Sequence, residues 1–443
     1  MSYVIIVASF LCGYKIYKSR GQQRFDWFIC CMLLFSSAIV LIQKPQLPCH
    51  RFFMLCYGLS IWANHEYKNR KFPLVSALTI YAAGILLVGI QSEFLTPFYK
   101  VYKPFALLLD SYIVLLVGYY GCRNEALFSK PIVNTFLLVT LYGVVTFAMM
   151  RNPLTELVHE AFNIHVRDDY YFGSRIRINS TWSHSISWGF ICSAFFYAFL
   201  QYASRVKIRF LLFLLMLNIF LCGSRTALAA FILMGAVVIM MRYKLKRSMQ
   251  VAFSALGVAV LAYLFVPMVQ EKVDSVVLTA LGQDTEAGSS LDMREGQTEA
   301  TMAITAEKPL MGHGIDYIGE QMGYGTDHFT GDSRLFGFES YAYIILIERG
   351  FFGLALEIFI VIALLMFAVK HRRFHRTDSS YILSLLLGFV FFSLATGTLD
   401  TTIPTMFLIG LNMSRVTPPS WLIRVKNYFC ALLSHRTLKP CAI

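Results

Sequence analysis

Charged residues are scarce in this chain of 443 residues. They make up 15% of it, whereas hydrophobic residues make up 57% and the mean hydropathy is +0.58. A soluble protein has roughly 25% charged residues. The composition therefore excludes a soluble globular enzyme and a disordered chain. The net charge of +13 lies between hydrophobic runs instead of on one face, which excludes a nucleic-acid-binding domain.

Metal-binding and secretion signals are also missing. The 10 cysteines are scattered, many of them inside hydrophobic runs, and none forms a CxxC pair. We therefore expect neither a disulfide framework nor a metal site, and we read the thiols as buried apolar groups. Residues 2–15 do not resemble a signal peptide, because basic residues follow the apolar run instead of preceding it. The sequence contains no tandem repeat and no separable soluble domain.

Long hydrophobic runs fill most of the chain. A run of about 17–25 apolar residues can cross a bilayer as a helix. This pattern predicts an all-α, polytopic integral membrane protein with 12 or 13 transmembrane helices and a large outward loop between late spans. The expected spans are 2–15, 25–43, 51–64, 72–91, 101–120, 131–150, 183–203, 208–222, 224–241, 249–268, 351–369, 381–397 and 402–413.

Lysine and arginine residues gather between alternate spans, for example at 15–24, 68–71, 242–247 and 370–376. The positive-inside rule makes these loops cytoplasmic. The N-terminus is then outside, and the long loops 151–182 and 269–338 face outward. The second of these loops has 12 acidic residues against 4 basic ones, so it contributes nothing to the positive charge of the whole chain.

The chain divides into six segments by composition. Long outward loops that join rigid spans are where membrane enzymes place their chemistry. The segments are N-terminal transmembrane helices (1–150), a first outer loop (151–182), central transmembrane helices (183–268), a large outer loop (269–350), C-terminal transmembrane helices (351–413) and a basic cytoplasmic tail (414–443).

Arg225 stands between two apolar runs at the expected outer end of a span. Charged residues at membrane depth are costly and usually line a cavity or pair with another charge. A snorkelling arginine at the headgroup level is the alternative. Gly223 and Ser224 predict a tight, hydrogen-bonding turn that presents the guanidinium, and arginine can hold a phosphate by two parallel hydrogen bonds.

Arg294 and Glu339 are the other charged candidates. Arg294 lies near the start of a predicted amphipathic helix over 291–304, whose apolar face would include Met293, Ala300, Ala303 and Ile304. Glu339 opens an apolar segment that Gly350 and Gly353 would break or bend. A carboxylate in such a setting can accept a proton. A solvated arginine and a helix N-terminal carboxylate are the alternatives.

Four segments together resemble the superfamily of O-antigen ligases and Wzy-type O-antigen polymerases of the bacterial envelope. The segment 223–228 (Gly-Ser-Arg-Thr-Ala-Leu) is similar to the arginine turn of that superfamily. Arg294 followed by 307–314 is similar to its arginine, helix and Pro-Leu-x-Gly-x-Gly segment. Residues 339–354 are similar to its last outer motif, and 177–184 to its first outer-loop segment.

Glu339 departs from the pattern of the ligases, which carry histidine at this position and use it as presumed base on the acceptor hydroxyl. Ser340 stands where they carry asparagine. This departure favours a polymerase and leaves the base open. Glu339 would serve directly, or one of several other side chains would take its place. These are His313, His328, Asp332 and His184.

The resemblance implies a metal-independent, cofactor-free glycosyltransferase of the bacterial inner membrane with its active site facing the periplasm. The donor would be an oligosaccharide on undecaprenyl diphosphate, and the acceptor a glycan, with membrane lipid around them. A flippase and a chain-length regulator are further expected partners. Arg225 and Arg294 would bind the diphosphate and Glu339 would act as base. The expected substrate-binding residues are Arg177, His184, His313, His328, Arg334 and Tyr341.

Two other functions stay open at this point. One is an O-antigen ligase that transfers glycan to lipid A-core. The other is a transporter or flippase of lipid-linked sugars. A transporter usually shows paired repeats with broken helices near the membrane midplane, whereas the polar residues of this chain concentrate in outer loops.

Overall fold

The computed structural model describes most of the transmembrane part of the chain. The described residues are 2–36, 38–42, 46–68, 70–121, 127–162, 171–172, 175–200, 202–242, 250, 270, 274, 286–323, 330–335, 337–373, 375–397 and 400–417.

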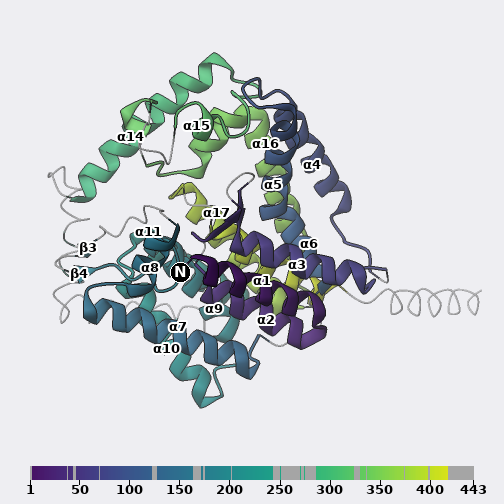
Figure 1. Cartoon of the computed structure of the whole chain (residues 1–443), viewed down its shortest axis with the longest axis vertical. Helices are drawn as coiled ribbons and strands as arrows, with labels where there is room; N and C mark the ends of the chain where they lie inside the picture. The colour runs from purple at the N-terminus through teal and green to yellow at the C-terminus, as the bar shows by residue number, and fades with distance from the viewer. Residues whose placement is uncertain are drawn as a thin grey trace, which may run out of the picture.

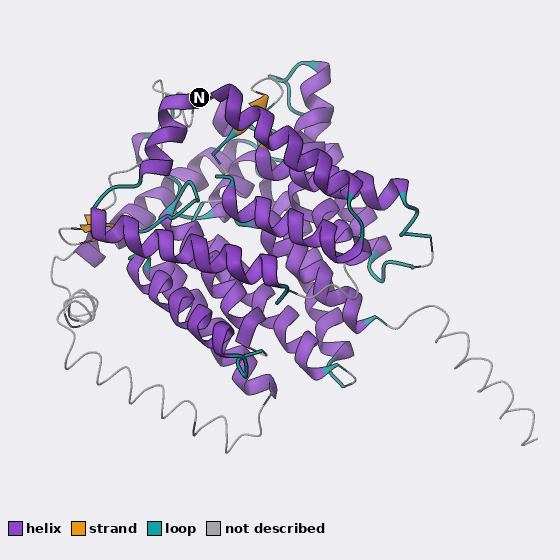
Figure 2. Ribbon diagram, turned by 60° about the horizontal axis from the view of Figure 1, so that its bottom comes forward, coloured by secondary structure: helices purple, strands orange, loops and turns teal. Residues whose placement is uncertain are grey.

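Helices make up almost all of the regular structure (Figures 1 and 2). They are α1 (Ser2–Lys18), α2 (Gly21–Leu34), α3 (Cys49–Ala63), α4 (Val75–Ile90), α5 (Pro97–Leu108), α6 (Val114–Gly121), α7 (Lys130–Met149), α8 (Pro153–Phe162), α9 (Ser185–Leu200), α10 (Val206–Leu221), α11 (Arg225–Arg242), α14 (Glu286–Glu307), α15 (Tyr317–Glu320), α16 (Tyr341–His371), α17 (Arg376–Leu394) and α18 (Thr402–Val416).

Shorter elements connect these helices. A π-helical turn, η1 (Leu109–Ile113), joins α5 to α6, and a 3-10 turn, η2 (Ser333–Leu335), precedes α16. Two short antiparallel strand pairs complete the described structure. They are β1 (Val40–Ile42) with β2 (Leu47–Pro48), and β3 (Tyr171–Phe172) with β4 (Arg175–Ile176).

The expected all-α membrane fold is confirmed. Each expected span overlaps a helix except 249–268, of which the structure describes only residue 250. The structure has 5 described helical stretches that are long and apolar enough to cross a membrane, and α4 and α9 are shorter apolar helices. The five stretches are Pro97–Gly121, Lys130–Met149, Arg225–Arg242, Tyr341–His371 and Arg376–Leu394.

The expected span 25–43 is wrong in its second half. Helix α2 ends at Leu34, and Val40–Ile42 instead forms β1 and pairs with β2. The physical reason is local: Ser36 accepts a hydrogen bond from the Ala38 backbone N–H through its side chain, and such side chains draw the backbone out of a helix.

Small residues bring the central helices close together. A Cβ atom on Gly118 of α6 would lie 2.3 Å from the Phe407 carbonyl oxygen of α18, and one on Gly410 would lie 2.1 Å from the Leu115 carbonyl oxygen. Glycine at such positions lets helix backbones approach where hydrocarbon surrounds the bundle. The contact between α6 and α18 thus forms the centre of the helix bundle.

Helix α16 is broken at Gly350, as the sequence predicts. Gly350 has φ 61° and ψ −163°, a conformation open in practice only to glycine. At the break, two backbone N–H groups of α16 donate to the turn at 309–310 instead of to their own helix. The N–H groups of Phe351 and Phe352 donate to the carbonyls of Pro309 and Leu310, both at 2.9 Å. The break therefore fastens the large outer loop to the transmembrane helices.

Candidate active site

Arg225 is the first residue of α11 and follows a tight turn. Gly223 has φ +63°, and the Ser224 hydroxyl accepts a hydrogen bond from the Ala227 N–H at 3.1 Å, so it caps the helix. The predicted presenting turn is confirmed. The side chain of Arg225 is exposed, and it has no hydrogen-bond or ionic partner among the described residues.

The packing of α11 against α17 sets the neighbourhood of Arg225. The Ser384 hydroxyl donates to the Met234 carbonyl at 2.8 Å, and Arg242 donates to the Ser380 hydroxyl at 3.1 Å. These contacts show that the two helices run antiparallel. Arg225 precedes Met234 by nine residues, and the end of α17 follows Ser384 by about as many. Arg225 therefore lies level with the end of α17 along the helix axis.

Arg294 reaches the same end of α17 from the large outer loop. Its Nη2 donates to the Ala395 carbonyl at 3.3 Å and to Glu339 Oε2 at 3.3 Å. The two side chains are 37% and 33% exposed, so the ion pair is accessible to solvent. The Glu339 N–H donates to the Gln297 side chain at 3.0 Å, which fixes the loop against α14. The structure thus joins two of the expected catalytic residues directly.

Asp400 is a residue of this region that no sequence pattern singles out. It lies in the turn between α17 and α18, where Ser183 and Ser187 both donate their hydroxyls to its carboxylate. Ser187 is in the first turn of α9, and Gly189 of that helix packs against Cys222 and Ala227 beside the Arg225 turn. The ends of α9, α11 and α17 and the start of α18 therefore meet here; we call this the Arg225 end of the bundle.

Arg177 lies at the same end of the bundle. The next residue, Ile178, is buried and donates its N–H to the Leu221 carbonyl at 3.4 Å, just before the Arg225 turn. The loop that follows is held by hydrogen bonds from Ser180 to the Val139 carbonyl at 2.7 Å and from Thr181 to the Leu33 carbonyl at 2.5 Å. These contacts fix the backbone that carries Arg177.

His184 also lies at this end, but it has a helix-capping contact. Its Nδ1 accepts the N–H of Ile186 at 3.2 Å, and its carbonyl accepts the N–H of Trp188 at 3.1 Å. A ring nitrogen that accepts a backbone hydrogen bond is occupied in the structure. This contact argues against His184 as the base, although it does not separate the residue from the site.

His313 is remote from Arg294 and Glu339. It is almost fully buried, stacks on Tyr317 with ring centroids 4.5 Å apart, and its Nε2 lies 3.1 Å from the Ile304 carbonyl. Ile304 is ten residues beyond Arg294 on α14, which is about 15 Å along a helix. The structure therefore does not bring His313 together with the other expected site residues.

Tyr341 belongs to a polar cluster inside the bundle. Its hydroxyl accepts a hydrogen bond from Arg349 Nη2 at 2.6 Å, and the Arg349 guanidinium lies 5.4 Å from its ring centroid. Arg349 in turn pairs with Glu357 at 2.8 Å. The Tyr341 hydroxyl is thus engaged with the protein.

Arg334 lies on η2 beside α14, next to Gly296, but it is paired with acidic residues. Its Nη2 lies 2.7 Å from Asp332 Oδ2, and its Nη1 lies 3.2 Å from Glu299 Oε2. Hydrogen bonds from Arg334 hold the pKa of Asp332 below its usual value. Asp332 is therefore a poor proton acceptor. His328, the remaining histidine candidate, lies outside the described residues.

The predicted helix over 291–304 exists as part of α14, but its buried face differs from the prediction. Met293 and Ala303 are exposed, whereas Gln297, Ala300 and Thr301 are buried. Small polar residues make this contact because Gln297 donates to the Gly337 carbonyl and accepts from the Glu339 N–H. Hydrogen bonding to the 337–339 loop, together with the apolar contacts of Ala300, orients the helix and with it Arg294.

The Arg225 end thus gathers unlike charges from distant parts of the sequence. Arg225 and Arg294 approach the end of α17 from two helices, Glu339 pairs with Arg294, and Asp400 follows α17. Figure 1 shows α14 above this region, with α11 and α17 nearer the middle of the molecule. Two guanidinium groups can hold an anion, and a neighbouring carboxylate can accept a proton.

Comparison with known proteins agrees with this arrangement. Residues 210–358 match the family model of the O-antigen ligase, a stretch that includes Arg225, Arg294 and Glu339. No curated protein matches the chain. The match supports the resemblance of residues 210–358 to the O-antigen ligase and Wzy-type superfamily, and with it an enzyme of glycan transfer in a multi-pass membrane protein.

Proposed function

We propose that this protein polymerises an envelope polysaccharide. It would transfer a glycan from undecaprenyl diphosphate to a hydroxyl of an acceptor lipid-linked repeat, at the outer face of the bacterial inner membrane. The observation that carries the proposal is that Arg294 contacts Glu339 and the end of α17, while the packing of α11 against α17 places Arg225 level with that end. The Lys and Arg distribution supports a periplasmic location for this end.

The two arginines would bind the diphosphate of the donor. Arg225 has no partner among the described residues, and Arg294 has an unpaired buried Nε and one solvent-accessible ion pair. Binding there would neutralise the charge that develops on the diphosphate as it leaves. Because Arg294 also holds Glu339, a bound diphosphate would compete for Arg294 and free the carboxylate.

The group transfer would then proceed in one displacement. The acceptor hydroxyl oxygen attacks the anomeric carbon of the donor sugar and forms the new glycosidic bond. The bond between that carbon and the diphosphate oxygen breaks, and its electron pair goes to undecaprenyl diphosphate. The hydroxyl proton passes to a carboxylate. Chemistry of this kind needs no nucleotide sugar and no cofactor, because the lipid diphosphate is already an activated leaving group.

Glu339 is our proposed proton acceptor. The other candidates are less suitable on geometric grounds. Asp332 is paired with Arg334, and His184 accepts a backbone N–H. His313 contacts Ile304, which is about 15 Å beyond Arg294 along α14. Asp400 is held by two serine hydroxyls. We assign it a positioning role, in which it fixes the start of α9 beside the Arg225 turn.

A ligase that transfers glycan to lipid A-core is the second candidate, since the matching family model is described as O-antigen ligase. Glu339 in place of the ligase histidine favours the polymerase. The purified protein, reconstituted with an undecaprenyl-diphosphate-linked repeat unit, should form chains of increasing length, with or without chelator. Product that forms only when lipid A-core is added would support the ligase. Movement of the lipid-linked sugar without a new glycosidic bond would support a transporter.

A further inference from the structure

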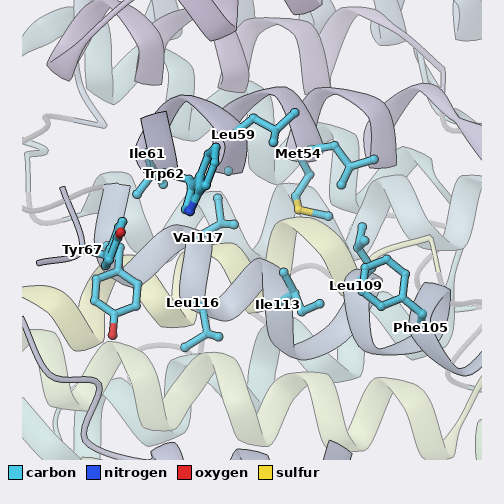
Figure 3. A pocket seen from close by; sticks show the side chains of 13 residues that line it. Met54, Leu59, Ile61, Trp62, Tyr67, Phe105, Leu109, Ile113, Leu116 and Val117 are labelled. Carbon is cyan, nitrogen blue, oxygen red and sulfur yellow. The ribbon is translucent and has the colours of Figure 1, made fainter. Parts of the chain in front are cut away.

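An apolar groove lies between α3 and the α5–η1–α6 stretch (Figure 3). It has a volume of about 310 Å³. Met54, Leu59, Leu109, Ile113 and Leu116 contribute to its wall. The groove is therefore lined almost entirely by hydrocarbon side chains, and Leu59 at its rim is 53% exposed.

The groove is long enough for one lipid chain. Its lining extends from Phe105 to Tyr120 along the second wall, which is 15 residues or about 22 Å of helix. One leaflet of a bilayer is about 15 Å of hydrocarbon, half of the core thickness. An acyl chain from a single leaflet fits within that length.

One end of the groove carries aromatic rings with polar tips. Figure 3 shows Trp62 and Tyr67 there, with Phe105 at the opposite end. Tyr67 follows Glu66, which pairs with Arg24 near the start of α2. The other end of α2 lies at the Arg225 end of the bundle, because the Leu33 carbonyl accepts a hydrogen bond from Thr181. Tryptophan and tyrosine are typical of the boundary between hydrocarbon and lipid headgroups.

Basic residues lie next to that aromatic end. Lys68 and Lys71 are exposed, and neither has an ionic partner among the described residues. Their loop is fastened to α6, because Arg70 donates to the Tyr119 carbonyl at 3.3 Å and the Tyr119 hydroxyl donates to the Lys71 carbonyl at 3.0 Å. A fixed pair of cations beside an apolar groove is complementary to an anionic headgroup with a hydrocarbon tail.

We propose that this groove binds an anionic phospholipid. One acyl chain lies between α3 and α6, and the phosphate headgroup lies at Lys68 and Lys71. Because those lysines are at the end predicted to be cytoplasmic, the lipid comes from the inner leaflet. This site is separate from the glycan-transfer site and does not depend on the function proposed for it.

Trp62 provides the test. The full-length protein is reconstituted in dioleoylphosphatidylcholine vesicles with increasing fractions of either phosphatidylglycerol or phosphatidylcholine brominated on its acyl chains. Subtracting the signal of W62F isolates the quenching of Trp62. We expect brominated phosphatidylglycerol to reach half-maximal quenching at a lipid fraction at least threefold lower than brominated phosphatidylcholine does. Equal quenching by both lipids overturns the proposal.

Two variants separate the headgroup site from the groove. Lys68→Gln/Lys71→Gln should abolish the preference for phosphatidylglycerol, whereas Lys370→Gln/Arg373→Gln should keep it. Ile113→Phe/Leu116→Phe fills the groove and should reduce quenching by either lipid at least twofold, whereas Leu138→Phe, on the exposed surface of α7, should not. The proposal is contradicted if the Lys68→Gln/Lys71→Gln variant keeps the preference for phosphatidylglycerol. It is also contradicted if filling the groove leaves the quenching of Trp62 unchanged.

Discussion

Arg349 offers the sharpest test of the described packing. Its guanidinium is 1% exposed inside the bundle and pairs with Glu357 at 2.8 Å, within α16. The Tyr81 hydroxyl of α4 donates to Glu357 Oε1 at 2.5 Å, and the Tyr112 hydroxyl of η1 donates to Oε2 at 3.3 Å. The pair and its two tyrosine partners therefore link three elements, and Arg349→Met should remove the cation from this cluster while Glu357 stays behind.

The expected cost follows from the burial of the pair. Removing one partner of a buried ion pair typically costs about 3–5 kcal/mol, because the other charge stays buried and unpaired. Glu357 is 19% exposed and would keep two tyrosine hydrogen bonds, so we expect about 3 kcal/mol for Arg349→Met. In Arg349→Met/Glu357→Gln no unpaired charge remains at the pair, and lost hydrogen bonds should cost only about 1–2 kcal/mol.

The free energy of unfolding of both variants can be measured by titration with dodecyl sulfate in mixed micelles. The double variant should be more stable than Arg349→Met alone. Glu357→Gln alone serves as the matched control and completes the cycle. If Arg349→Met costs less than about 1 kcal/mol, or if the two single costs simply add, the described ion pair does not hold α16 to α4 and η1.

Three further predictions address the break, the site and the core. Gly350→Ala places a Cβ 2.6 Å from the Gly312 nitrogen in a strained conformation, so it should destabilise the protein by about 3 kcal/mol or more in the same titration. Asp400→Asn weakens the acceptor for two serine hydroxyls and should lower the transfer rate about tenfold with an unchanged unfolding curve. The buried Trp188 indole N–H donates to the Asn218 side chain at 2.9 Å, and Asn218→Leu removes this acceptor. Its expected cost is about 1–3 kcal/mol, measured as a lower melting temperature.

The transmembrane helices could be predicted because their signal is local. A long apolar run with few charges can only span a bilayer as a helix, and the described helices follow the expected runs closely. The exception, 25–43, shows the limit of this reasoning. Hydropathy does not distinguish a buried helix from a short buried strand, and the hydrogen bond made by the Ser36 side chain decided the outcome.

The site was predictable only in part. Arg225, Arg294 and Glu339 could be selected because charges beside apolar runs are costly. Their neighbourhood could not, since Arg294 contacts Ala395, 101 residues away in the chain. Asp400 was missed because a lone acid in a short turn has no distinctive spacing, although an acid between two spans is itself a signal. The orientation of α14 depends on Gln297, whose hydrogen bonds no periodicity reveals.

The central claim is that Arg225 and Arg294 together hold the diphosphate of the donor. The most direct measurement is the initial rate at which undecaprenyl diphosphate is released by the purified, reconstituted protein. Arg225→Ala and Arg294→Ala should each abolish release while the unfolding curve stays close to that of the unchanged protein. Release at the normal rate by either folded variant would contradict the account.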